Sequence, residues 1–189
     1  ADNTQGEAPA GFLRVLINGK ADGQHWLNGT DKKSPVKSRV AAAGWLTDTD
    51  NGAGHLLARV IVNRIWQWHF GKPLVATPSN FGIRGTPPTH PKLLDWLAVD
   101  FVESGWSIKR LHRKIVLSKT YRLESHSNPE NQVIDPGIRW YWRFDRNRLD
   151  AEAIRDAMLQ ASGKLDETRP GPHPFPARAN YKFSQHNPF

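Results

Sequence analysis

The strongest structural signal in this sequence is a helical repeat over residues 54–69. Apolar residues recur there every three or four positions, at Leu57, Ile61, Ile65 and Trp68. This spacing places them along one face of an α-helix. Arg59, Asn63 and Gln67, each four apart, form a polar line on another face. Gly71 follows at once and predicts the end of the helix, because glycine readily adopts the left-handed conformation of a C-terminal cap.

Weaker patterns of the same kind predict further helices. We expect them at residues 36–46, 91–104, 107–115, 136–142 and 151–162. Ser107 and Asp150 are suitable N-caps, because their side-chain oxygens can accept a hydrogen bond from a free backbone N–H. Gly105 and Gly163 are suitable helix ends. The expected inward-facing residues are Leu94, Leu97 and Phe101 for the helix at 91–104 and Ile108, Leu111 and Ile115 for the helix at 107–115. For the helix at 151–162 they are Ile154, Ala157, Met158 and Ala161.

The stretch from 136 to 144 fits two structures. Pro136 suits the first position of a helix. The alternation of Trp140, Trp142 and Phe144 equally suits a short strand, and we favour the helix. The sequence therefore predicts a mainly α fold. We expect five or six helices with long irregular connections rich in Pro and Gly, and little or no β-structure.

The chain divides into three expected regions. These are an irregular arm at residues 1–36, a helical core domain at 37–166 and an irregular segment at 167–189. Gly, Asn, Asp and Lys dominate the arm, apart from the apolar run Phe12 to Ile17, which predicts a strand or turn. The last region has too many prolines for regular structure. The chain begins without Met, and we expect it to be a piece of a longer parent chain.

Charge and composition narrow the functional classes. The 189 residues carry a formal net charge of +8, and a basic balance favours polyanionic partners. No cysteine is present, which excludes disulfides, thiolate catalysis and covalent haem attachment through a Cys-x-x-Cys-His motif. No run approaches the roughly 20 apolar residues that a membrane-spanning helix needs. The first residues lack the basic and apolar regions of a signal peptide.

Several motifs in one order resemble a known domain family. The main ones are residues 59–71 (RVIVNRIWQWHFG), 88–91 (PTHP), 94–98 (LDWLA), 118–122 (SKTYR) and 148–156 (RLDAEAIRD). Together they resemble a planctomycete-specific domain of unknown function that often accompanies cytochrome-c-like domains in large exported proteins. The resemblance implies a periplasmic or extracellular location and a parent chain that continues past Phe189. It also implies a protein partner such as a c-type cytochrome domain, with any haem held in that partner.

An arginine-rich aromatic segment is the main candidate for a ligand or partner surface. Its residues are Arg139, Trp140, Trp142, Arg143, Arg146 and Arg148. Arginines among aromatic rings can hold phosphates or sugar acids and stack on planar groups. The alternative is a polar network inside the protein, in which these arginines pair with Asp145, Asp150 and Asp156.

Four carboxylates are candidates for acid–base chemistry, namely Asp95, Asp145, Asp150 and Glu152. Two acids within about 5 to 10 Å of each other can hydrolyse a glycosidic bond. Ion pairing with arginine is the alternative for these residues, since helical spacing brings Glu152 close to Arg148 and Arg155.

His69 and His90 are the candidates for a metal or haem contact. No pair of histidines has the local spacing of a metal site. The alternatives are structural, because a charged His69 would stabilise the C-terminal end of its helix, and His90 precedes a helix start at Pro91.

Three functions remain open at this point. The leading hypothesis is a non-catalytic interaction module that docks onto a cytochrome-linked redox assembly outside the cytoplasm. The first alternative is an exported enzyme that acts on a polysaccharide through Asp or Glu side chains. The second is a module that binds a polyanion or nucleic acid.

Overall fold

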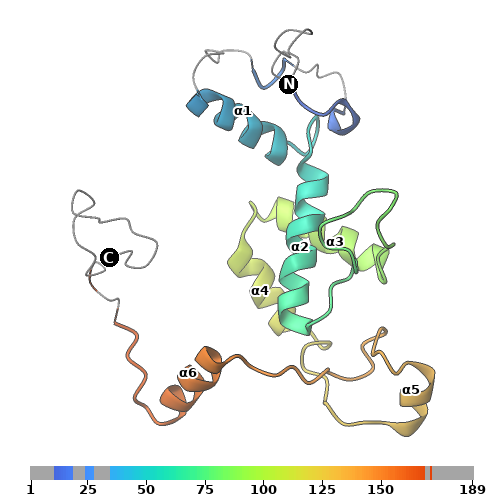
Figure 1. The fold of residues 1–189 in the computed structure, drawn as a ribbon, viewed down its shortest axis with the longest axis vertical. Helices are drawn as coiled ribbons and strands as arrows, with labels where there is room; N and C mark the ends of the chain where they lie inside the picture. Colours follow the sequence, from blue (N-terminus) through green and yellow to red (C-terminus); the bar gives the residue numbers. More distant parts are fainter. Residues whose placement is uncertain (1–10, 19–23, 28–34, 169–170, 172–189) are drawn as a thin grey trace, which may run out of the picture. The chain divides into compact units, whose positions relative to one another are not determined.

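Six α-helices form the regular structure of the residues that the computed structural model describes, which are 11–18, 24–27, 35–168 and 171 (Figure 1). The helices are α1 (Pro35–Thr47), α2 (Gly54–Phe70), α3 (Pro91–Glu103), α4 (Ile108–Val116), α5 (Pro129–Ile134) and α6 (Ala151–Ala161). A short 3-10 turn, η1 (Arg14–Leu16), precedes them. These described residues contain no β-strand, and the predicted mainly α fold is confirmed.

The chain forms two compact units, residues 1–147 and 148–189. The first unit holds α1 to α5, and the second holds α6. The three regions expected from composition, with limits at residues 36 and 166, stay predictions.

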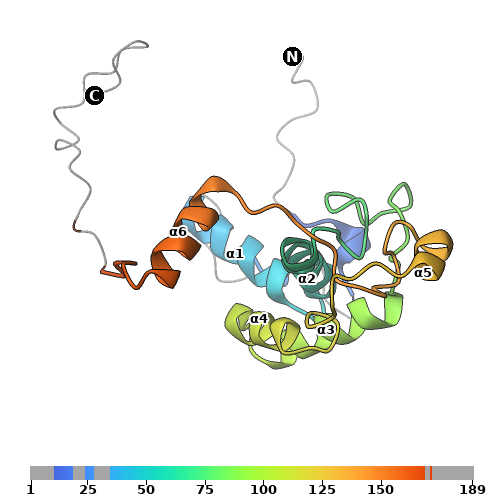
Figure 2. The ribbon, with the colours of Figure 1, turned by 90° about the horizontal axis from the view of Figure 1, so that it is seen from below.

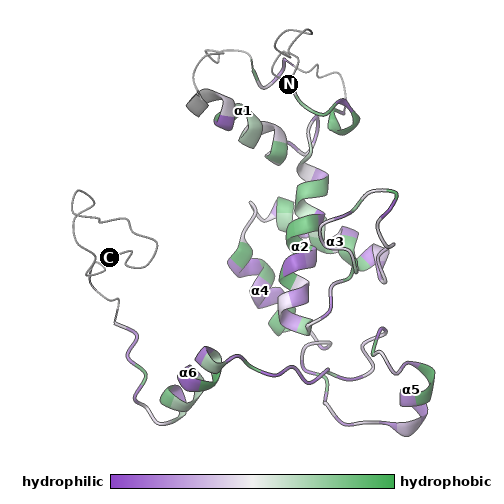
Figure 3. Cartoon of the chain, in the orientation of Figure 1, coloured by the Kyte–Doolittle hydropathy of each residue, from purple (hydrophilic) through white to green (hydrophobic). Residues whose placement is uncertain are grey.

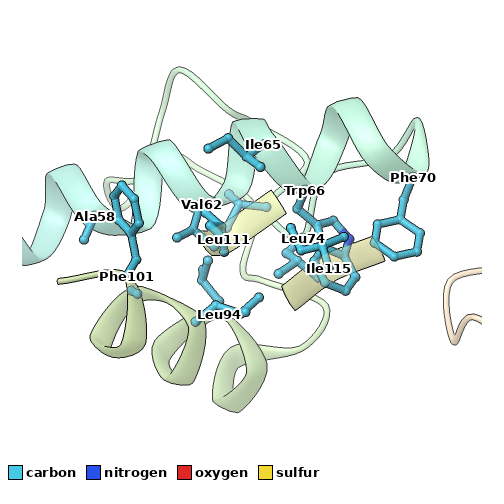
Figure 4. Close-up of a cluster of buried hydrophobic side chains, with 13 residues drawn as sticks. Ala58, Val62, Ile65, Trp66, Phe70, Leu74, Leu94, Phe101, Leu111 and Ile115 are labelled. Atoms are coloured by element: carbon cyan, nitrogen blue, oxygen red, sulfur yellow. The ribbon is translucent and has the colours of Figure 1, made fainter. Parts of the chain in front are cut away.

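The core of the first unit is built around α2, which packs against α1, α3 and α4 (Figures 1 and 2). Figure 4 shows side chains of α2 pointing toward residues from α3, from α4 and from the segment after α2. The buried set is Ala58, Val62, Ile65, Trp66 and Phe70 of α2, Leu74 and Val75, Leu94, Leu97, Ala98 and Phe101 of α3, and Leu111 and Ile115 of α4. The predicted inner face of α3 is confirmed.

The inner face of α2 differs from the predicted one. Trp68 is 78% exposed, and Leu57 and Ile61 are only partly buried, whereas Val62 and Asn63 are completely buried. The polar line predicted on the other face of the helix therefore includes a core residue, Asn63. Compared with the predicted orientation, α2 turns a different face toward the core. Asn63 can be buried on that face because its amide has hydrogen-bond partners inside the protein.

Asn63 binds the backbone of the segment that follows α2. Its Oδ1 accepts a hydrogen bond of 2.8 Å from the Val75 N–H, and its Nδ2 donates one of 3.1 Å to the Val75 carbonyl. Both polar groups of Val75, itself 2% exposed, are thereby satisfied away from water. The chain reverses at Gly71, whose φ of 73° is left-handed, as predicted for a helix end.

A tight turn joins α3 to α4. Gly105 and Trp106 have φ values of 71° and 59°, and Ser107 caps α4 by accepting a hydrogen bond from the Arg110 N–H, as predicted. The Trp106 ring packs edge-on against Phe101, with 5.3 Å between centroids, which fixes the turn to the core. Ile108 is 51% exposed, contrary to expectation, because it occupies the first position of the helix and not the face that packs inward.

The helix predicted at 136–142 does not form. Helix α5 ends at Ile134, one residue before Asp135, and the carboxylate of Asp135 accepts a hydrogen bond of 2.8 Å from the Trp140 N–H. This bond closes a loop where a helix was expected. The signal for α5 was present in the sequence, since Asn128 is an N-cap and Pro129 takes the first helical position.

The described parts of the N-terminal region contact α1. Phe12 stacks on Trp45 and meets Trp26 edge-on, each at 5.3 Å between centroids. Asp48 accepts hydrogen bonds from the Asn51 and Asp50 N–H groups and from the Trp26 indole. Burial raises the pKa of Asp48, but these hydrogen bonds outweigh it and hold the pKa below the ordinary value.

In the second unit, Asp150 caps α6 by accepting a 2.7 Å hydrogen bond from the Ala153 N–H. Gly163 has a φ of 68° and follows the end of the helix, as predicted. The expected inward face is not buried, since Ile154 is 41% and Met158 68% exposed. The described part of this unit offers no second helix against which that face could pack.

Candidate functional site

The arginine-rich aromatic segment forms a loop held by Asp135. In addition to the bond from Trp140, the backbone carbonyl of Asp135 accepts hydrogen bonds from the Trp142 indole at 3.0 Å and from the Ile138 N–H at 3.1 Å. Ile138 and Tyr141 both have a φ of 52°. Left-handed backbone at a β-branched residue and at an aromatic residue is strained, and such strain persists only where the surroundings fix the chain.

Two side chains attach this loop to the end of α2. The Trp66 indole donates a 2.7 Å hydrogen bond to the Tyr141 hydroxyl, and burial raises the pKa of Tyr141. Lys72 donates to the Gly137 carbonyl at 2.9 Å and to the Asp145 carboxylate at 2.6 Å. The loop is therefore a fixed platform, and its outward side chains are presented in a defined orientation.

Arg139 and Trp140 form the exposed part of this platform. Trp140 is 60% exposed, and the Arg139 guanidinium carbon lies 5.7 Å from the centroid of its ring. The His90 ring lies edge-on to Trp140, with 5.3 Å between centroids. Burial first, and the charge of Arg139 second, lower the pKa of His90. An exposed aromatic ring with a cation beside it suits a planar or anionic partner group.

The remaining residues of the predicted surface are placed differently. Arg143 lies over the Trp142 ring at 5.1 Å and 3.8 Å from the Asp145 carboxylate, with both side chains partly buried. Arg146 is exposed beside the Ser125 hydroxyl, and Arg148 begins the second unit. The structure thus brings Arg139 and Trp140 together at the surface. Arg143 instead points inward and pairs with Asp145, which is one of the contacts that the alternative predicted.

Two of the candidate carboxylates are paired with cations. Asp95 accepts a 2.8 Å hydrogen bond from Arg59. The bond from Lys72 is the largest influence on Asp145, and it lowers the pKa of that carboxyl together with the charge of Arg143, against the effect of burial. A carboxylate held in its ionised form is poorly suited to donate a proton as a general acid.

The other two candidate acids lie in the second unit. Asp150 uses a carboxylate oxygen to cap α6, and Glu152 is exposed in the first turn of that helix. An acid in the first helical turn is favoured by the helix dipole. These contacts give both residues a structural role and do not test the acid–base hypothesis.

His69 is paired with His112, a histidine outside the candidates predicted from the sequence. His69 Nε2 lies 2.6 Å from His112 Nδ1 of α4, so one ring donates to the other. Burial first, and the charge of His112 second, lower the pKa of His69. This disfavours the expected imidazolium at the end of α2. Nothing in the local sequence connects the two histidines, because 43 positions separate them and only the packing of α2 and α4 joins them.

We expect this domain to lose stability as the pH falls from 7 to 5. The pKa values of His69 and His90 are lowered in the folded state, so below the ordinary value of 6.5 the unfolded chain binds more protons than the folded chain. Urea unfolding monitored by circular dichroism at pH 7, 6 and 5 measures the trend. The double variant His69→Gln, His90→Gln should show a shallower pH dependence over this range, and an unchanged slope would refute the assignment.

No group of three or more His, Asp or Glu side chains suited to a metal ion occurs in the described part of the chain. The contacts of His69 and His90 are with other protein groups. Their role as haem contacts stays a prediction.

A family of proteins of unknown function, PSD1 (DUF1553), matches residues 38–188. This span takes in most of α1 and all of the helices that follow it. The chain belongs to this family. No curated protein and no solved structure matches the DUF1553 chain.

The DUF1553 match confirms the resemblance to a domain of unknown function. The matched residues belong to both compact units and cover both the loop platform and α6. The association with planctomycetes, with export and with cytochromes stays a prediction. None of the helices in the described ranges is both long and apolar enough to cross a membrane.

Proposed function

We propose that this DUF1553 chain is a non-catalytic interaction module whose contact surface is centred on Arg139 and Trp140. The observation that supports this most is an exposed tryptophan on a loop that Asp135, Lys72 and Tyr141 hold in place. Tryptophan and arginine dominate the binding energy of protein interfaces. A surface fixed before binding loses little conformational freedom when the partner arrives.

The proposed partner is a c-type cytochrome domain of an exported redox assembly, and the haem belongs to that partner. Support for this partner comes from the family resemblance carried by residues 59–71 and 148–156. The chain itself has no cysteine for covalent haem attachment. The pairing of Asp95 and Asp145 with cations favours binding over acid–base catalysis.

Isolation of the tagged chain from its native cells tests this function. We expect the eluate to show a haem Soret band that shifts on reduction, and the double variant Arg139→Ala, Trp140→Ala to reduce the band at least about tenfold, as loss of two interface anchors does. The control is Arg64→Ala, Trp68→Ala, which removes an exposed arginine and an exposed tryptophan from α2. Equal bands from both double variants would exclude the surface, and an eluate of the unaltered chain without haem would exclude the partner.

A further inference from the structure

A groove on the first unit has no residue of the loop platform in its lining. It has a volume of about 540 Å³, with Trp66 and Ile115 among its buried walls. Its other walls include Trp96 and Leu97 of α3, Arg110, Arg113 and Lys114 of α4, and Leu117 beyond the end of α4. No acidic residue is among the lining residues, so the groove combines apolar walls with positive charge alone.

The lining follows the two helices in a regular way. On α3 it uses positions 93, 96 and 97, and on α4 it uses 110, 113, 114 and 115 and then 117 just beyond the helix end. Positions three and four apart share one face of a helix. Two stripes of this kind on neighbouring helices can form the seat for a third helix, and the α4 stripe is about 10 Å long at a rise of about 1.5 Å per residue. An occupant helix of two to three turns spans it.

Exposed apolar atoms and unpaired charge make this groove a site for a partner. Trp96 is 55% and Leu117 58% exposed. Within the described part of the chain, the guanidinium groups of Arg110 and Arg113 have no acid or hydrogen-bond partner. Lys114 differs, since it bonds to Asp100 and lies 4.7 Å from the centroid of the Trp96 ring. Figure 3 shows both hydrophilic and hydrophobic residues on α4.

We propose that this groove binds an amphipathic helix of a partner protein that carries acidic residues along one edge. The apolar face of that helix lies on Trp96 and Leu117, where it covers carbon atoms now exposed to water. Its carboxylates face Arg110 and Arg113, which can each hold a carboxylate through two parallel hydrogen bonds. This inference does not depend on the partner proposed for Arg139 and Trp140.

Two synthetic helical peptides of 15 residues test the proposal by fluorescence anisotropy. Both carry leucine at positions spaced three and four apart, and the edge beside the leucines is glutamate in one and lysine in the other. We expect the glutamate peptide to bind the unaltered chain at least about tenfold more tightly than the lysine peptide. The double variant Arg110→Glu, Arg113→Glu should reverse that order, because complementary charge across an interface sets the choice of partner.

The matched control is Arg64→Glu, Lys109→Glu, which makes the same change in net charge at two exposed positions outside the groove. It should leave both affinities within about threefold. Trp96→Ala should weaken the binding of both peptides, since it removes apolar contact and no formal charge. Circular dichroism confirms that each variant is folded.

Three results would overturn the proposal. The first is equal binding of both peptides to the unaltered chain. The second is an equal effect of the groove variant and its control, which would mean that net charge alone attracts the peptide. The third is binding to vesicles of phosphatidylserine and phosphatidylcholine, weakened in the groove variant, without binding of either peptide. That result would assign the groove to an anionic membrane surface.

Discussion

The variant Asn63→Leu is expected to lower the free energy of unfolding by about 2 to 5 kcal/mol. Leucine has the same number of side-chain heavy atoms, branched at the same Cγ position, but offers no polar atom. The N–H and carbonyl of Val75 then lose the partners that now lie at 2.8 and 3.1 Å. Each buried backbone group left without a partner costs about 1–3 kcal/mol. Among the described residues, neither group of Val75 has a second hydrogen-bond partner, so the loss should appear almost in full.

Urea unfolding monitored by far-ultraviolet circular dichroism measures this change. Gln67→Leu is the matched control, because it replaces an amide on the same helix at a partly exposed position. We expect its effect to stay within about 0.5 kcal/mol, as for most substitutions near the surface. If the two variants lost similar stability, the bonds between Asn63 and Val75 would not explain why α2 buries its asparagine.

The variant Trp66→Ala is expected to lower the free energy of unfolding by about 3–5 kcal/mol, the usual effect of truncating a large buried aromatic residue. Trp66 is 4% exposed and stacks on Phe70 with 4.2 Å between ring centroids. It also holds the Tyr141 hydroxyl. Its loss therefore removes core contacts and one attachment of the loop that carries Trp140.

The matched control is Trp68→Ala, two residues further along the same helix, where the side chain is 78% exposed. We expect that variant to change the free energy of unfolding by no more than about 0.5 kcal/mol. Tyr141→Phe separates the hydrogen bond from the packing, since it keeps the ring and leaves the Trp66 N–H without its acceptor. Its expected cost is about 1–3 kcal/mol. A larger loss of stability at Trp68 than at Trp66 would contradict the observed burial of Trp66 and exposure of Trp68.

The local sequence determined where most helices begin and end. Ser107 and Asp150 cap their helices as predicted, and Gly71, Gly105 and Gly163 take left-handed backbone at the helix ends. These features depend on groups within a few residues of each other, so they can be derived from the sequence alone. The same reasoning found the inner face of α3, where the apolar residues have no polar competitor.

The tertiary structure decided which surfaces are buried and which side chains meet. Asn63 is in the core because Val75 supplies its partners from the segment beyond α2, and no periodicity reveals a bond between those positions. The bonds from Trp140 and Trp142 to Asp135 replaced a predicted helix with a loop.

For the candidate site, the sequence identified Arg139 and Trp140 by residue type. It did not reveal which of the arginines turns inward, that His112 pairs with His69, or that α3 and α4 line a basic groove. Caps and turns are set by neighbours along the chain and can be found from the sequence. Burial and pairing are set by residues from distant segments, and they exist only once the helices have packed.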